Sequence, residues 1–214
     1  GVGSAVTGAN LTADAEEFSC NAYLVTGARP TLVDAGTMPG IADAVREHVD
    51  HLDAVVLTHQ HRDHVARLDE VLDIFEPTCY AYGDHPRRDE PLADGDTVRL
   101  GDETFDVVYT PGHADDHVSL VSDQTLFSGD VVVYEDGAFS DGSFGRTDMA
   151  GQSRGRLIES LHDLLDRLPE SVEAMYAGHG GPYVAGETAD ESVREVVARA
   201  LTRAERREPK YPEE

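Results

Sequence analysis

A dense group of metal-binding side chains lies in the segment 58–64, which reads Thr-His-Gln-His-Arg-Asp-His and directly follows an apolar run. Its metal-capable members are His59, His61, Asp63 and His64. Imidazole binds zinc and other borderline metals, and a carboxylate in the same cluster is typical of hydrolytic sites with an open coordination position. Capping of a helix would explain Asp63 alone and gives no reason for three histidines. The segment therefore predicts a metal site.

Three further side chains have a similar placement along the chain. His113, Asp130 and His179 each follow a glycine just beyond a β-type run. Loops at strand ends are common places for functional side chains, and glycine permits the turn that points the next residue inward. Taken singly each is a weak indication, because a lone histidine is more often structural. Together with the cluster they make seven donors, which predicts two metals.

This donor set resembles that of the metallo-β-lactamase superfamily. The family signature His-x-His-x-Asp-His is met by 59–64, and a separate His, Asp and His follow in the family's order at positions 113, 130 and 179. The resemblance runs over most of the chain, from about residue 18 to residue 181. It implies an α/β fold, the four-layer αββα sandwich, with the metals in a cleft at the sheet edges.

The resemblance also implies a ligand assignment for two divalent metals, with zinc expected first and iron or manganese as alternatives. One metal would be held by His59, His61 and His113. The other would be held by Asp63, His64 and His179, and Asp130 would bridge the two. The remaining histidines are expected not to be ligands; they are His48, His51, His85, His117 and His162.

Two further segments match elements of the family. Asp34 in Val-Asp-Ala-Gly resembles the family's acid that orients a ligand histidine, although an aspartate two residues before Gly36 is also an ordinary turn residue. The segment 145–148, Gly-Arg-Thr-Asp, resembles the Gly-Arg-x-Asp element of glyoxalase II-like thioesterases and the related persulfide dioxygenases. A purely structural interaction between Arg146 and Asp148 that pins a loop is compatible with this reading.

The leading functional hypothesis is a hydrolase of 2-hydroxyacyl thioesters, similar to hydroxyacylglutathione hydrolase. A metal-bridging hydroxide would attack the thioester carbonyl, and Asp63 would orient the water or accept its proton. Asp115 and Asp116 replace the small residues usual after the third histidine of the pattern, and one helix follows His179 where glyoxalase II adds a thiol-binding domain. The thiol carrier of the substrate therefore stays open.

Other functions use the same residues. A persulfide dioxygenase would need a single iron held by His59, His113 and Asp130, and a lactonase would use both metals. A non-catalytic metal-binding protein is the alternative outside enzymes, since a fold does not establish a function. Nucleic-acid processing is disfavoured, because the short separation of Asp130 and His179 leaves no room for the inserted domain of the family's nucleases.

Alternating β-type runs and amphipathic stretches must position these side chains, and they predict one α/β domain over 1–214 with a frayed tail at 208–214. Strands are predicted at 18–26, 31–34, 54–58, 78–82 and 172–177, with hairpins at 97–100/104–109 and 117–122/125–128. Helices are predicted at 40–49, 64–75, 153–168 and 187–207. The stretch 131–152 is too rich in Gly, Asp and Ser for a regular element and long enough to be a functional loop.

The balance of acidic and basic residues limits which classes of binding partner are expected. The chain of 214 residues has 42 acids and 17 bases, for a net charge of −25, and Lys210 is the only lysine. A field of this sign repels nucleic acid and anionic membrane surfaces, which disfavours both as partners. The expected partner is the small-molecule thioester that the family resemblance implies. Because concentrated salt screens self-repulsion, the composition favours a halophilic cytoplasm, such as that of a halophilic archaeon. The alternative is an ordinary acidic protein whose codon bias favours arginine.

Cysteine content and hydropathy indicate the compartment. Cys20 and Cys79 allow at most one disulfide, so buried reduced thiols are expected. No apolar window is long enough to span a membrane, and the first twenty residues lack the basic start and apolar stretch of a signal peptide. A cytoplasmic location is therefore expected.

Overall fold

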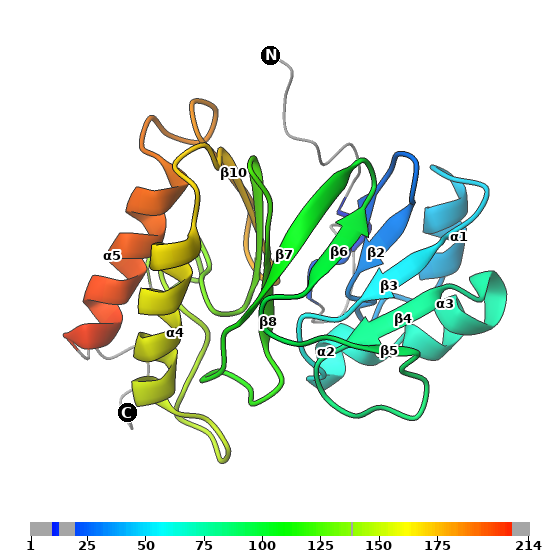
Figure 1. The fold of residues 1–214 in the computed structure, drawn as a ribbon, viewed down its shortest axis with the longest axis horizontal. Helices are drawn as coiled ribbons and strands as arrows, with labels where there is room; N and C mark the ends of the chain where they lie inside the picture. The colour runs from blue at the N-terminus through cyan, green and yellow to red at the C-terminus, as the bar shows by residue number, and fades with distance from the viewer. Residues whose placement is uncertain (1–9, 13–19, 138, 207–214) are drawn as a thin grey trace. The chain divides into compact units, whose positions relative to one another are not determined.

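The structure is a computed structural model that describes residues 10–12, 20–137 and 139–206 (Figure 1). The chain divides into two compact units, Gly1–Asp106 and Val107–Glu214, and the boundary falls inside strand β7 (Glu103–Tyr109). The predicted frayed tail lies outside the described residues. That the whole chain forms one domain stays a prediction.

A five-stranded sheet in the order β1-β2-β3-β4-β5 forms the framework of the first unit. Its strands are β1 (Tyr23–Val25), β2 (Thr31–Val33), β3 (Ala54–Val56), β4 (Thr78–Ala81) and β5 (Glu90–Pro91). β1 is antiparallel to β2, and the pairs from β2 to β5 are parallel. Strands β1 to β3 are buried at every position, as is usual for parallel strands such as β2 and β3.

The helices of the first unit are α1 (Ile41–Arg46), α2 (Arg62–Val65) and α3 (Leu68–Phe75). The single helix predicted at 64–75 is wrong, because the backbone breaks between α2 and α3. At the break the backbone N–H of Arg67 donates to the carbonyl of Gly36, which takes it out of the helical ladder. The expected apolar face is present, and Leu68, Val71 and Leu72 are buried on it.

A six-stranded sheet has the order β11-β10-β9-β8-β7-β6. Besides β7 it contains β6 (Thr97–Leu100), β8 (Val118–Val121), β9 (Thr125–Gly129), β10 (Ala174–Ala177) and β11 (Tyr183–Val184). The two predicted hairpins are confirmed as the antiparallel pairs β6–β7 and β8–β9. β9 and β10 are parallel, so their carboxyl ends lie at the same edge of the sheet.

Two long helices pack side by side in the second unit, α4 (Arg154–Arg167) and α5 (Val193–Glu205) (Figure 1). Their apolar faces belong to the core of this unit, through residues such as Leu161 and Val197. α5 begins six residues later than predicted. Ser192 and Glu195 form a capping box there, and the preceding residues close a turn after β11.

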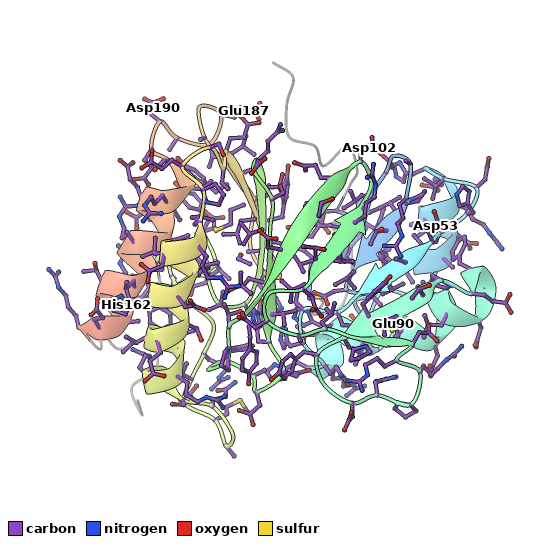
Figure 2. The ribbon with its side chains drawn as sticks, viewed as in Figure 1. Asp53, Glu90, Asp102, His162, Glu187 and Asp190 are labelled. Carbon is purple, nitrogen blue, oxygen red and sulfur yellow. The ribbon has the colours of Figure 1, made fainter. Side chains whose placement is uncertain are left out.

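Acidic side chains lie at the surface of both units, as Glu90, Asp102, Glu187 and Asp190 illustrate (Figure 2). Within the described ranges, no helix is long and apolar enough to cross a membrane. The two mixed sheets and their helices confirm the α/β class.

Candidate metal centre

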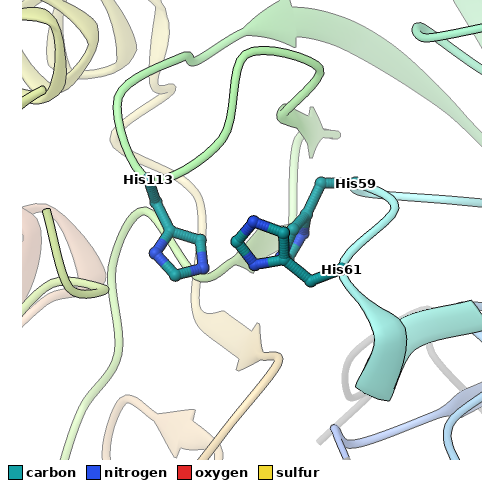
Figure 3. A group of neighbouring side chains, drawn as sticks. All are labelled: His59, His61 and His113. Atoms are coloured by element: carbon teal, nitrogen blue, oxygen red, sulfur yellow. The ribbon is translucent and has the colours of Figure 1, made fainter. Parts of the chain in front are cut away.

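The first unit gathers three histidines at the carboxyl end of β3. His59 and His61 project from the loop that follows this strand (Figure 3), and His64 belongs to α2. The ring of His59 lies 4.6 Å from the ring of His61 and 4.0 Å from that of His64, measured between centroids. His59 and His64 are buried. The hydrophobic strand thus ends in a compact imidazole cluster.

Asp34 lies behind this cluster and orients it. The residue directly follows β2, is 2% exposed, and has a φ of 61°, a conformation that costs energy for a residue other than glycine. Its Oδ1 accepts from the backbone N–H of Thr58 at 2.9 Å, and its Oδ2 accepts from the Thr58 hydroxyl at 2.7 Å. The same Oδ2 lies 2.9 Å from Nδ1 of His64.

These bonds determine which nitrogen of each ring carries the proton. The Thr58 hydroxyl has one hydrogen, which goes to Asp34, so its oxygen accepts from Nδ1 of His59, 3.1 Å away. Nδ1 of His64 likewise donates to Asp34. In both rings Nε2 then has the lone pair through which histidine binds a metal.

Asp63 lies within the first turn of α2, and His61 occupies the N-cap position without a side-chain capping bond. The capping alternative for Asp63 is therefore wrong. Oδ2 of Asp63 is 3.8 Å from Nε2 of His64, so an oxygen and a nitrogen donor face each other.

The second unit brings together the other three predicted ligands. His113 lies on the loop after β7 (Figure 3), Asp130 follows β9, and His179 lies beyond β10. Nε2 of His113 is 3.4 Å from Oδ2 of Asp130, and Nδ1 of His179 is 2.7 Å from Oδ1. Each carboxylate oxygen of Asp130 therefore faces a different histidine.

The donor geometry fits a metal. Ligand atoms bound tetrahedrally at about 2.1 Å lie about 3.4 Å from one another. The separation between Nε2 of His113 and Oδ2 of Asp130 has this value. Nδ1 of His113 donates to the carbonyl oxygen of Arg146 at 2.9 Å, so here too Nε2 is the nitrogen with the lone pair.

The loop over 131–152 supports His113 through its backbone. The N–H of Gly145 donates to the Asp130 carbonyl at 2.7 Å. A Cβ on Gly145 would lie 2.3 Å from that oxygen and 2.7 Å from Nδ1 of His113, so only glycine fits. The Arg146 guanidinium makes two bonds with Asp148, at 2.8 and 2.7 Å, and they lower the pKa of that carboxyl.

Three contributors were missed by sequence reasoning: the Thr58 hydroxyl, the bare backbone of Gly145, and His117. His117 was expected not to be a ligand, and its Nε2 accepts a hydrogen bond from the backbone N–H of Asp130. Of the other histidines, His51 and His162 lie 3.6 and 3.5 Å from acidic side chains, and His85 accepts from a backbone N–H.

The sequence model of the Metallo-beta-lactamase superfamily matches residues 15–210 of the chain. The chain belongs to the metallo-β-lactamase superfamily. The expectation drawn from the 59–64 signature is thereby confirmed at the level of the family.

Individual curated proteins are also similar in sequence to this superfamily member. A hydroxyacylglutathione hydrolase of Vibrio cholerae is 34% identical over 152 residues, which cover 69% of this chain and 56% of the relative. The chain spans about half the length of the curated relatives it matches.

Solved structures have a similar fold. ETHE1 from Myxococcus xanthus superposes with a TM-score of 0.65 at 22% identity, over 86% of this chain and 92% of that one. TTHA1623, solved in a di-iron-bound form, has a TM-score of 0.63 at 28% identity, over 85% of this chain and 93% of the other. The metallo-β-lactamase type of fold is thus confirmed, and the superfamily relatives imply a site for two metals.

Proposed function

We propose that the protein is a metal-dependent hydrolase of 2-hydroxyacyl thioesters with a dinuclear centre. The observation that carries the proposal is the arrangement of donors in each unit: buried histidines whose Nδ1 positions are held by hydrogen bonds, and an aspartate with one oxygen toward each of two histidines. The substrate class is supported by relatives that are hydroxyacylglutathione hydrolases.

The proposed ligand assignment is the one that the superfamily resemblance implies. His59, His61 and His113 would hold one metal, and Asp63, His64 and His179 the other, with Asp130 shared. When bound, two divalent metals would lower the pKa of a shared water toward ~7 and would supply an electrophile for the carbonyl oxygen. We propose zinc, the metal that imidazole and carboxylate donors suit best, with iron or manganese as alternatives.

The chain's own residues then act around the metals. Asp34 holds His64 directly and His59 through Thr58, and the Arg146 carbonyl holds His113. Asp63 lies next to a donor nitrogen and would orient the nucleophilic water or accept its proton. No serine or cysteine nucleophile is needed, because a water held at the metals would supply the nucleophile and the thiolate of a thioester is a good leaving group.

The compartment and partners belong to the same proposal. A net charge of −25 supports a small-molecule substrate over nucleic acid or an anionic membrane. The side chains of Cys20 and Cys79 are buried and are not joined in a disulfide, which supports a reducing cytoplasm. The near absence of lysine supports a cytoplasm of high salt.

Metal analysis of freshly purified protein, paired with turnover of lactoyl thioesters on several thiols in concentrated KCl, tests this function. We expect two metals per chain and thioester hydrolysis that falls at least about a hundredfold in His59→Ala. His162→Ala, an exposed histidine of α4, serves as the matched control and should retain full activity.

Other outcomes would assign other functions. One iron per chain together with O₂ uptake on a thiol persulfide would indicate a persulfide dioxygenase, and turnover of lactones alone a lactonase. Bound metal with no turnover of any of these substrates would indicate a non-catalytic metal-binding protein.

A further inference from the structure

His117 is a buried ionisable side chain that the proposed chemistry does not use. Its ring is 0% exposed and lies between Thr110 and Asp130. Nδ1 is 2.8 Å from the Thr110 hydroxyl, and Nε2 is 2.9 Å from the backbone nitrogen of Asp130. Both ring nitrogens thus have a partner inside the second unit.

The bond with the backbone of Asp130 determines which ring nitrogen of His117 donates and which accepts. A backbone N–H can only donate, so Nε2 of His117 accepts and bears no proton. Nδ1 therefore carries the ring proton and donates to the Thr110 hydroxyl. The same hydroxyl is also hydrogen-bonded to Ser119, whose Oγ is 2.9 Å away. With its Nε2 lone pair taken by Asp130, His117 is not a metal ligand in this arrangement.

The hydrogen bond from the Asp130 N–H to His117 fixes the backbone directly after β9. Gly129, just before it, has a φ of 50°, so the backbone turns sharply as β9 ends. On its other side, the carbonyl of Asp130 accepts from Gly145. The backbone N–H and C=O of Asp130 are therefore both engaged, while its two carboxylate oxygens face His113 and His179.

From this geometry we infer that His117 is a positioning residue, which accepts the Asp130 N–H and so holds that carboxylate in place to bridge two metals. This inference rests on the proposed function, because it concerns the same centre. A partner that orients a ligand from behind typically changes metal affinity about 10- to 100-fold when it is lost.

Two substitutions separate the Asp130 contact from general packing. In His117→Gln the amide oxygen comes close to the former place of Nε2 and can accept from Asp130. In His117→Asn the amide reaches only the place of Nδ1, so the Thr110 contact is kept and the Asp130 contact is lost. The measurements are metal affinity by competition with a chromophoric chelator, and thermal unfolding of the metal-free proteins.

We expect His117→Asn to bind metal at least about tenfold more weakly than the wild type, and His117→Gln to stay within about threefold. Both metal-free variants should unfold at similar temperatures, below that of the wild type. Equal metal affinities in the two variants would overturn the inference, because any loss of affinity would then come from the changed packing and not from the lost contact with Asp130. A wild-type protein that binds no metal would instead overturn the proposed function, and this inference with it.

A measurement on the unmodified protein does not depend on whether a variant folds. Nitrogen-15 NMR of histidine-labelled wild-type protein distinguishes protonated from unprotonated ring nitrogens. For His117 we expect the proton on Nδ1 and a hydrogen-bonded, unprotonated Nε2. A proton on Nε2 would overturn the inference.

Discussion

Nδ1 of His64 lies 2.9 Å from Oδ2 of Asp34, an oxygen that also accepts the hydroxyl hydrogen of Thr58. We expect Asp34→Asn to weaken metal binding about 10- to 100-fold, because an amide cannot accept both hydrogen bonds at full strength. Asparagine tolerates the positive φ of this position, so the backbone should not be strained.

Chelator competition on Asp34→Asn and on the exposed control Asp43→Asn measures this effect. The control residue lies in the first turn of α1 and should leave metal affinity unchanged. Unchanged affinity in Asp34→Asn as well would show that this carboxylate does not orient the ligands.

Gly145→Ala tests the close approach of the loop to His113. The added Cβ meets the Asp130 carbonyl and the His113 ring, so one of these groups must move. We expect metal affinity and thioester turnover to fall at least about tenfold. Gly155→Ala, on α4, is the control: its Cβ would make only an ordinary contact, 3.8 Å from the Ser153 hydroxyl, and the change should raise the free energy of unfolding by up to ~1 kcal/mol. Full activity of Gly145→Ala would contradict the role assigned to the loop.

The ion pair of Glu191 with Arg199 predicts a pH-dependent contribution to stability. Hydrogen bonds from the guanidinium, one of them 2.7 Å long, lower the pKa of the Glu191 carboxyl. A carboxyl with a lowered pKa stabilises the fold above its unfolded value of about 4.3, and this contribution is lost as the pH falls through the folded value.

Urea unfolding of the wild type and Glu191→Gln at pH 7 and at pH 3 checks this sign. We expect a difference in the free energy of unfolding of about 1 kcal/mol at pH 7 that shrinks at pH 3. Glu187→Gln, at an exposed position nearby, should show no difference at either pH. If the difference in free energy of unfolding between the wild type and Glu191→Gln grew toward low pH, the stabilising role assigned to the Glu191–Arg199 ion pair would be refuted.

Cys79 should be unreactive in the folded protein. Burial, with the nearby Asp89, raises the pKa of its thiol to about 11, and both cysteines are 0% exposed. With a pKa of about 11, only about one thousandth of this thiol is thiolate at pH 8. Labelling with a disulfide reagent should give no fast reaction in the native state and two thiols per chain after unfolding. Rapid labelling of native Cys79→Ala would show that Cys20 is accessible.

Salt should stabilise this protein. With a net charge of −25, the acidic side chains repel one another in the compact folded state. Raising the ionic strength from ~0.1 M to ~1 M shortens the screening length from ~10 Å to ~3 Å and so weakens this repulsion. We expect the unfolding temperature to rise with KCl and equally with NaCl, as screening requires. A midpoint that is indifferent to both salts would favour the codon-bias explanation of the composition.

The strands and the places of the predicted ligands could be predicted because both are local properties of the sequence. Short apolar runs that stop at glycine or at a polar residue, such as the run before His59, mark both the strand and the loop that follows. The hairpin turn around Gly101 has the same local character. These signals need no knowledge of distant residues.

The rest depends on partners far along the chain. The break before α3 is set by a carbonyl of Gly36, and the roles of Thr58 and His117 depend on residues 24 and 13 positions away. Strand β11 has only two residues and is defined by its pairing with β10. The spacing of hydrophobic residues along the sequence gives no information about such long-range contacts.

The contact between Arg146 and His113 is made by a main-chain oxygen, and this has a consequence for protein engineering. Randomising the side chain at position 146 in a mutant library leaves that acceptor in place, whereas position 145 admits no diversity. Selection for new specificities can therefore begin at 146 and 148, where variation does not remove the carbonyl that holds His113.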